Sequence, residues 1–419
     1  MHLATGKRKA RTGTFIDNLK LPVHRWFRYS AGFSADWVKA VIEESHATSI
    51  FDPFAGSGTT LLAADSCGIE SQGTEAHIFV SRIADAKLSW NFDREVFSAL
   101  TKDFVDRAQS IIQTEHRSND KLLGKMYDND TLSLLEKFRL SYLHDDFPKN
   151  TKEGKLIWLG ITSILRPCSY AGTAQWQYVL PNKRKNASKN PLDAFNTYCD
   201  QVTADSFQVL LEGWVKNSNV ILHDARLPFN TDRQFDLLVT SPPYPNNYDY
   251  ADATRLEMTF WKEVEGWKDL QSVVRKNLLR SCSQHSAAER LDLETLLKAD
   301  VLSPIIEELR PICEKLKEIR LTKGGKKTYH TMVAAYFSDL ANILINLRSI
   351  MKSGSRMCFV IGDSAPYGVH VPAERWLGEL AIAAGFKGYT FEKLRDRNIK
   401  WDNRVHKVPL HEGNLWIEG

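Results

Sequence analysis

The 419-residue sequence lacks an apolar run long enough to cross a bilayer, and its first residues are polar and basic, so we expect neither a membrane span nor a signal peptide. Its six cysteines are scattered and form no CxxC pair, which argues against a zinc site and favours a reducing, intracellular setting. Internal repeats and low-complexity segments are also absent from the sequence. We therefore expect a protein without a bound metal and without a membrane partner.

Charge of one sign is not in large excess either. The formal net charge of +4 permits nucleic-acid binding but does not show it, because the clustering of charge decides that property. With 43% hydrophobic and 25% charged residues, the composition is that of an ordinary soluble globular protein. The length suits one large domain with insertions, or two domains.

The stretch TSPPY at residues 240–244 follows an apolar run, residues 235–239, which predicts a buried strand of a parallel sheet. The two prolines end that strand, because proline has no N–H for the ladder and restricts the residue before it. Ligands bind at such carboxyl ends in open α/β sheets. The Ser241 hydroxyl and the Pro242 carbonyl could accept hydrogen bonds from the amino group of an extruded nucleobase, with the Tyr244 ring stacked on the base. The structural alternative is a Pro-Pro turn with an incidental tyrosine.

A second motif, DPFAGSGTT at residues 52–60, lies between a predicted short strand and a predicted helix. Its Gly-x-Gly turn lets the backbone approach a ligand where a Cβ atom would clash. Residues 68–75 predict a second strand that ends in Glu75, at about the position where nucleotide-binding folds place a ribose-binding carboxylate. The turn has no phosphate-binding lysine, which disfavours a P-loop. The alternative for Glu75 is a surface acid at the end of a strand.

The rest of the pattern predicts an α/β protein with a mostly parallel sheet, flanking helices and two insertions. A third short strand within residues 219–229 carries Asp224 near its end, and that carboxylate could accept a hydrogen bond from an adenine amino group. The C-terminal part alternates again, with helices at 333–351 and 373–384, a strand at 357–363 and a last edge strand at 414–417.

Three regions could contact nucleic acid. Helical patterns dominate residues 78–218, which also contain an aromatic-rich segment at 166–178 and a basic loop at 183–189. Interleaved basic and aromatic side chains could hold a backbone and stack on bases, and the alternative is a solvated loop. Residues 245–330 are polar and largely helical, and they could form a lid or a DNA-facing surface. The basic segment at residues 6–11 is either a flexible arm or a phosphate contact.

With both motifs in view, the sequence resembles the S-adenosylmethionine-dependent DNA amino-methyltransferases. Residues 52–60 are similar to the cofactor motif of that family, and residues 240–244 to its catalytic motif, in the Ser-Pro-Pro-Tyr form typical of the cytosine-N4 branch. The resemblance covers residues 21–89, 219–262 and 331–419, roughly half of the chain. It implies a Rossmann-like class I methyltransferase fold with a mostly parallel, seven-stranded sheet. It also implies double-stranded DNA as the substrate, a cytoplasmic setting in a bacterium or phage, and a cognate restriction endonuclease as a separate partner.

The family implies roles for the matching residues. The catalytic residues would be Ser241, Pro242, Pro243 and Tyr244. The residues that bind S-adenosylmethionine would be Phe33, Asp52, Pro53, Phe54, Gly56, Gly58, Thr59, Glu75, Asp224 and Ala225. Within that set, Glu75 would bind the ribose hydroxyls, and Asp224 and Ala225 would contact the adenine. From the basic and aromatic pattern, the candidate DNA contacts are Lys183, Arg184, Lys185 and Tyr248.

The order of the motifs differs from that of many Ser-Pro-Pro-Tyr enzymes, because here the cofactor motif comes first. We expect five segments: an N-terminal part with the cofactor motif (1–89), a helical insertion that is the candidate target-recognition region (90–218), a catalytic part (219–262), a second helical insertion (263–330) and a C-terminal part (331–419). The position of the first insertion is uncommon for target recognition, so either insertion, or both, could read the DNA sequence.

The favoured function is a DNA cytosine-N4 methyltransferase. An adenine-N6 enzyme is an alternative, because the first residue of the catalytic motif correlates with the target base only loosely. An RNA guanine-N2 methyltransferase would share the Pro-Pro-Tyr elbow, but no separate N-terminal RNA-binding module is visible. A non-catalytic cofactor-binding or DNA-binding protein would be expected to have a broken elbow, and this one is intact. An NAD-dependent oxidoreductase is disfavoured, because Leu61 stands where the third glycine of that fingerprint belongs.

Overall fold

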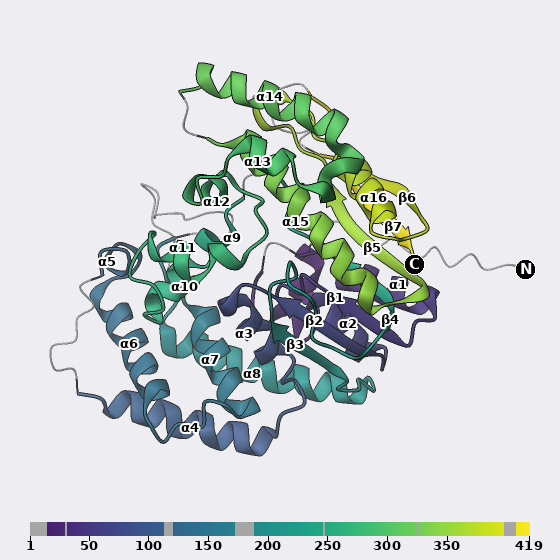
Figure 1. Ribbon diagram of the computed structural model, residues 1–419. Helices are drawn as coiled ribbons and strands as arrows, with labels where there is room; N and C mark the ends of the chain where they lie inside the picture. The colour runs from purple at the N-terminus through teal and green to yellow at the C-terminus, as the bar shows by residue number, and fades with distance from the viewer. Residues whose placement is uncertain are drawn as a thin grey trace, which may run out of the picture.

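The computed structural model describes residues 15–29, 32–112, 120–171, 188–245, 248–324, 327–397 and 408–419. Within these ranges the strands form one sheet in the order β3-β2-β1-β4-β5-β7-β6 (Figure 1). The strands are β1 (Ser49–Asp52), β2 (Glu70–Glu75), β3 (Ser218–Leu222), β4 (Phe235–Thr240), β5 (Met351–Gly362), β6 (Gly388–Arg397) and β7 (Leu410–Glu418). All pairs are parallel except those of β7, which runs antiparallel to β5 and β6. The predicted Rossmann-like methyltransferase fold is confirmed.

Helices bury both faces of the central strands. Leu237 and Val239 of β4 pack with α1 (Ala35–Ser45) and α2 (Thr59–Ser66), whereas Leu238 packs with α15 (Tyr329–Ile350) and α16 (Ala373–Ala383) on the other face. A strand that is covered on both sides has no solvent-facing positions, which explains the continuous apolar run in the sequence. The Ser34 hydroxyl caps the N-terminus of α1, because it accepts a hydrogen bond from the Trp37 N–H at 3.4 Å.

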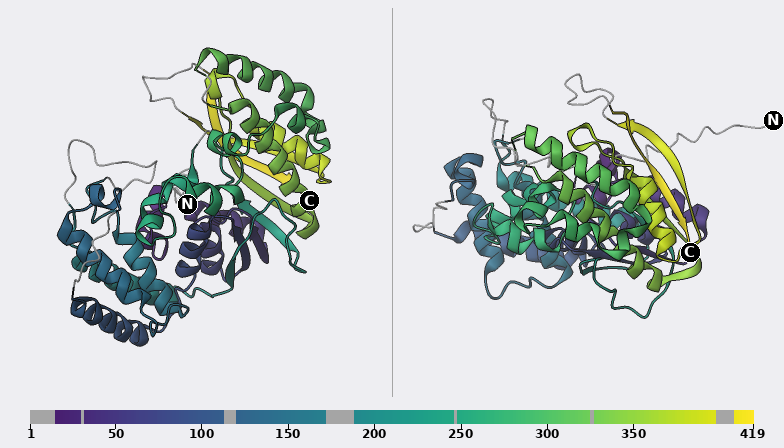
Figure 2. Two further views of the ribbon diagram at one scale, coloured as in Figure 1. Left: turned by 60° about the vertical axis from the view of Figure 1, so that its left-hand side comes forward. Right: turned by 45° about the horizontal axis from the view of Figure 1, so that its top comes forward.

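The first insertion is a group of helices between β2 and β3, and it follows α3 (Ile78–Lys87). Its helices are α4 (Arg94–Ser110), α5 (Leu123–Met126), α6 (Asn129–Leu143), α7 (Lys152–Ile164) and α8 (Pro191–Leu211). In both views of Figure 2 this blue and teal group lies on the opposite side of the molecule from the yellow strands β6 and β7. Buried Asp205 of α8 accepts hydrogen bonds from the Val23 N–H and the Trp26 indole, so α8 holds the N-terminal segment of η1 (Phe15–Lys20) and η2 (His24–Trp26).

The second insertion packs against α15. Its elements are α11 (Asp269–Val273), η3 (Arg275–Asn277), α12 (Ser283–Ala288), α13 (Leu293–Leu297), η4 (Asp300–Ile305) and α14 (Ile306–Thr322), and it follows α9 (Tyr250–Ala253) and α10 (Arg255–Phe260) of the catalytic part. A last short helix, η5 (Pro366–Gly368), follows β5. A buried ion pair joins the first insertion to the catalytic part, because Arg166 after α7 lies 2.6 Å from Glu257 of α10. The catalytic part is therefore braced by the first insertion.

Two expectations for the C-terminal part are wrong. The last strand, β7, is not an edge strand, because β6 pairs with its outer side. The pattern did not predict β6, since half of its ten residues are charged and its side chains are mostly half-buried or exposed. The strand expected at 357–363 begins earlier, because β5 starts at Met351 directly after α15 and includes the polar residues 352–355. Gly354 takes a φ of 79° there, and the pairing register with β4 shifts nearby.

Candidate active site

A cavity of about 590 Å³ lies outside the carboxyl ends of β1, β2, β4 and β5. The sheet order reverses between β1 and β4, and this switch point is where open α/β sheets bind ligands. Most of the predicted site residues line the cavity, namely Phe33, Pro53, Phe54, Gly56, Glu75, Asp224, Ala225, Ser241, Pro242, Pro243, Tyr244 and Tyr248. One cavity therefore contains residues from both motifs, which are almost 200 positions apart in the chain.

Asp52 connects the ends of β1 and β4 beneath the cavity. Its carboxylate accepts hydrogen bonds from the Thr240 hydroxyl at 2.6 Å and from the Phe54 N–H at 3.0 Å. Burial raises the pKa of Asp52 to about 6, although these hydrogen bonds act in the other direction. Its side chain does not line the cavity, and neither do Gly58 and Thr59, which start α2. These residues shape the turn, while Pro53 and Phe54 form the wall.

Glu75 ends β2 and is half-buried in the cavity wall. One carboxylate oxygen accepts the Gly56 N–H at 2.9 Å and the other accepts the His77 N–H at 2.8 Å. Burial raises the pKa of Glu75 to about 7, and the two backbone hydrogen bonds lower it in part. Gly56 has a φ of 53°, and a Cβ atom there would lie 3.3 Å from the Tyr29 ring. The turn, the carboxylate and Tyr29 therefore form one close-packed corner.

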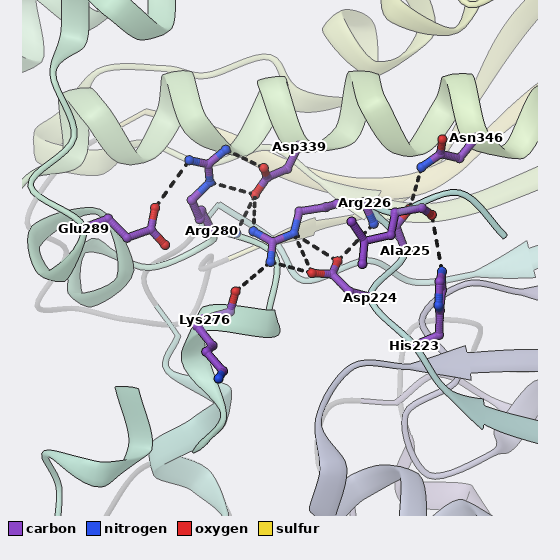
Figure 3. A network of polar contacts seen from close by, with 10 residues as sticks. His223, Asp224, Ala225, Arg226, Lys276, Arg280, Glu289, Asp339 and Asn346 are labelled. Atoms are coloured by element: carbon purple, nitrogen blue, oxygen red, sulfur yellow. Dashed lines mark hydrogen bonds and ion pairs between the residues drawn. The ribbon is translucent and has the colours of Figure 1, made fainter. Parts of the chain in front are cut away.

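Asp224 follows β3 and takes part in a charged network (Figure 3). Its carboxylate accepts hydrogen bonds from Arg226 Nε at 3.0 Å and Nη2 at 2.6 Å. Arg226 also donates to the Lys276 carbonyl at 2.7 Å and lies 3.6 Å from buried Asp339, which pairs in turn with Arg280. The Arg226 guanidinium thus fixes the Asp224 carboxylate at the cavity wall, where an adenine amino group could still use its remaining lone pairs.

The elbow after β4 is fixed through β5. The Ser241 hydroxyl donates to the Val360 carbonyl at 3.1 Å. Burial, and after it the charge of Glu412, raise the pKa of Tyr244 above its usual range, so the phenol stays neutral. Tyr248 lines the cavity and packs edge-on against Tyr250, with ring centroids 4.6 Å apart.

Several cavity residues were missed by the sequence patterns. Tyr29 and Ile16 come from the N-terminal segment. His77 is buried, and burial lowers its pKa to about 4, so its ring is neutral and contacts the Thr254 hydroxyl at 2.9 Å. Arg397 and Glu412 come from β6 and β7. Of the candidate DNA contacts, Lys183, Arg184 and Lys185 lie outside the described residues.

One cluster in the described residues has metal-ligand side chains: Asp249, Cys282 and His285 have ligand atoms within 4.8 Å of one another. The Asp249 carboxylate is already bound by the buried Arg275 guanidinium, at 2.7 Å from Nη2 and 3.1 Å from Nε. Burial raises the pKa of the Cys282 thiol to about 12, which disfavours the thiolate that a metal would need. The cluster is thus an ion pair with two neutral neighbours.

No described helix combines the length and the apolar character that a bilayer crossing requires.

The chain is similar to known methyltransferases. No protein-family model matches the chain. The chain is 25% identical over 410 positions to the Type II methyltransferase M.AvaI of a Nostoc species, covering 89% of this chain and 81% of that protein. It is 26% identical over 459 positions to the Type II methyltransferase M.BsoBI of Geobacillus stearothermophilus, covering 95% and 86%. A solved structure of the rRNA methyltransferase aviRa from Streptomyces viridochromogenes aligns over 93% of this chain and 86% of that chain, with a TM-score of 0.29 and 10% identity.

The similarity to Type II methyltransferases supports the DNA methyltransferase family that the two motifs predict. S-adenosylmethionine is the cofactor of methyltransferases of this kind, so the predicted cofactor is confirmed at that level. Neither relative's name states a target base.

Proposed function

We propose that this protein is a site-specific DNA methyltransferase that methylates the exocyclic N4 amino group of an extruded cytosine. The observation that carries the proposal is the single cavity that contains both the Glu75 corner and the Ser241–Tyr244 elbow. A volume of about 590 Å³ lies within the range of about 300–1,000 Å³ that is usual for ligand sites. The similarity to Type II methyltransferases supports DNA as the substrate.

The part of the cavity lined by Pro53, Phe54, Glu75 and Asp224, which we call the cofactor half, fits S-adenosylmethionine by its chemistry. Glu75 offers carboxylate oxygens that can accept hydrogen bonds from the two ribose hydroxyls, and Asp224 offers the same to the adenine amino group. Pro53 and Phe54 provide an apolar wall for the methionine end. When bound, S-adenosylmethionine supplies an electrophilic methyl group for the amino nitrogen of the base.

The elbow would prepare the amino nitrogen for attack. The lone pair of a cytosine amino group is delocalised into the ring, so the nitrogen is a weak nucleophile until it becomes tetrahedral. Because the Ser241 hydrogen is used by the Val360 carbonyl, the Ser241 oxygen faces other groups as an acceptor. Together with the Pro242 carbonyl, it would accept hydrogen bonds from the two N–H groups of the amino group and favour the tetrahedral form of its nitrogen. This catalysis depends on positioning and electrostatics.

The test is a methylation assay on mixed DNA and RNA with S-adenosylmethionine, followed by digestion to nucleosides and mass spectrometry. We expect N4-methylcytosine in DNA, and its loss in the Ser241→Ala variant. N6-methyladenine would keep the mechanism and replace the proposed target by the alternative one. A methylated guanosine from RNA, or no product on any nucleic acid while the cofactor still binds, would contradict the proposal.

A further inference from the structure

The strands β6 and β7 bring charged side chains to the part of the cavity next to the Ser241–Tyr244 elbow, which we call the base half. Arg395 and Arg397 near the end of β6 line it, together with Glu412 of β7. Arg395 is paired with Glu412 in the strand register, and its Nη2 lies 2.9 Å from the Glu412 carboxylate. The Arg397 Nε lies 4.0 Å from the other oxygen of the same carboxylate. Glu412 is only 4% exposed, so two cations stand around one buried anion beside the elbow.

The side chain of Arg397 is held in place by the backbone at the end of β5. Its Nη1 donates to the Asp363 carbonyl at 2.8 Å, directly after β5. It crosses β5 at Gly362, where a Cβ atom would lie 2.7 Å from Nη1 and 3.3 Å from Cδ, so a larger residue would displace it. Its side chain is 18% exposed. Because Val360 of the same strand holds the Ser241 hydroxyl, β5 fixes the distance between the guanidinium and the elbow.

The guanidinium of Arg397 lies over the ring of Tyr244, with Cζ 5.2 Å from the ring centroid. Tyr244 is the ring on which the target base is proposed to stack. Both side chains line the same cavity, so a base at the elbow would lie next to the Arg397 guanidinium.

We propose that Arg397 is a specificity-determining residue, whose guanidinium donates two hydrogen bonds to the O2 and N3 atoms of the extruded cytosine. This assignment rests on the proposed function. A guanidinium has only donors, arranged as a planar fork that fits two adjacent acceptors. Cytosine presents N3 and O2 side by side, next to the amino group that Ser241 and Pro242 would hold. Adenine presents N1 next to a C–H group, so the second arm of the fork would be unpaired.

Hydrogen bonds from Arg397 to the base should affect the choice of the base and not the rate of methyl transfer. A cationic donor at N3 and O2 draws electrons from the ring and does not make the amino nitrogen more nucleophilic. Arg397 should therefore act mainly on the binding and choice of the base, whereas Ser241 acts on the transfer. Glu412 lowers the cost of holding a cation in this half-buried place, because it offsets part of the positive charge.

The test compares the wild-type enzyme with Arg397→Gln on two DNA duplexes that differ only at the methylated position, one with cytosine and one with adenine. The duplex is taken from a site mapped with the wild-type enzyme. We expect kcat/KM on the cytosine duplex to fall about 10- to 100-fold, mainly through KM, because a hydrogen bond to a charged group is lost. The preference for cytosine over adenine should fall with it. Arg397→Lys keeps the charge without the fork, and it should restore only part of the preference.

Arg356→Gln is the matched control, because Arg356 of β5 also lies over an aromatic ring, 4.5 Å from the Trp416 centroid, but is not among the lining residues of the cavity. It should leave KM and the base preference unchanged. The inference is overturned if Arg397→Gln keeps the cytosine preference, or if it weakens S-adenosylhomocysteine binding as much as it raises KM. A wild-type enzyme that produces no N4-methylcytosine would refute the proposed function instead, and this is read from the wild-type product alone.

Discussion

The cofactor half and the base half of the cavity are built in different ways. In the cofactor half, the turn after β1 makes hydrogen bonds within one strand–helix–strand unit, from the Phe54 N–H to Asp52 and from the Gly56 N–H to Glu75 at the end of β2. In the base half, the elbow after β4 meets Arg397 and Glu412, which come from the other end of the chain. Short motifs therefore reveal the first half, and only the sheet topology completes the second.

Tyr244→Ala should break the base half and leave the cofactor half intact. Loss of the stacking ring costs about 1–3 kcal/mol per base, and the base also loses its position. We expect single-turnover methylation to fall about 10- to 100-fold or more, while the dissociation constant of S-adenosylhomocysteine changes less than about twofold. Rapid-quench kinetics and calorimetry measure the two quantities. Near-normal methylation would contradict the role of the elbow.

Glu75→Gln should have the opposite pattern. The variant loses charge-assisted hydrogen bonds to the ribose, so S-adenosylhomocysteine should bind about 10-fold more weakly at pH 8. In the wild-type protein the pKa of Glu75 is raised to about 7, so the carboxylate becomes ionised, and a better acceptor, as the pH rises through that value. Cofactor affinity should therefore increase from pH 6 to pH 8 in the wild type. Calorimetry that shows the same step at pH 7 in Glu75→Gln would rule out this carboxylate as its origin.

Removal of the basic loop charges should have the smallest effect. In a triple alanine variant of Lys183, Arg184 and Lys185, the slope of log affinity for DNA against log salt should decrease by about 0.9 for each DNA phosphate that the variant no longer neutralises. Cofactor binding should not change. Fluorescence anisotropy over a salt series measures the slope, and an unchanged slope would direct attention to residues 263–330.

The fold was largely predictable because its signals are local. Strands covered on both faces give apolar runs such as residues 235–239, and Ser34 marks the start of α1. The β6 strand gave no such signal, because its charged side chains face solvent or the cavity and leave no apolar run. Its sequence also does not indicate that it pairs with β7. Tyr29 was also missed, since its place beside Gly56 depends on the docking of the N-terminal segment on Asp205. Arg226 was missed although it stands two residues from Asp224, because only the fold brings Asp339 beside it.

A crystal structure with S-adenosylhomocysteine is the most direct test of the division into two halves. We predict the ribose within hydrogen-bonding distance of Glu75, the adenine beside Asp224 and Ala225, and the sulfur directed toward the Ser241–Tyr244 elbow. No part of the ligand should contact Arg397 or Glu412. A ligand that contacts either of them, or whose ribose lies away from Glu75, would contradict the division of the cavity.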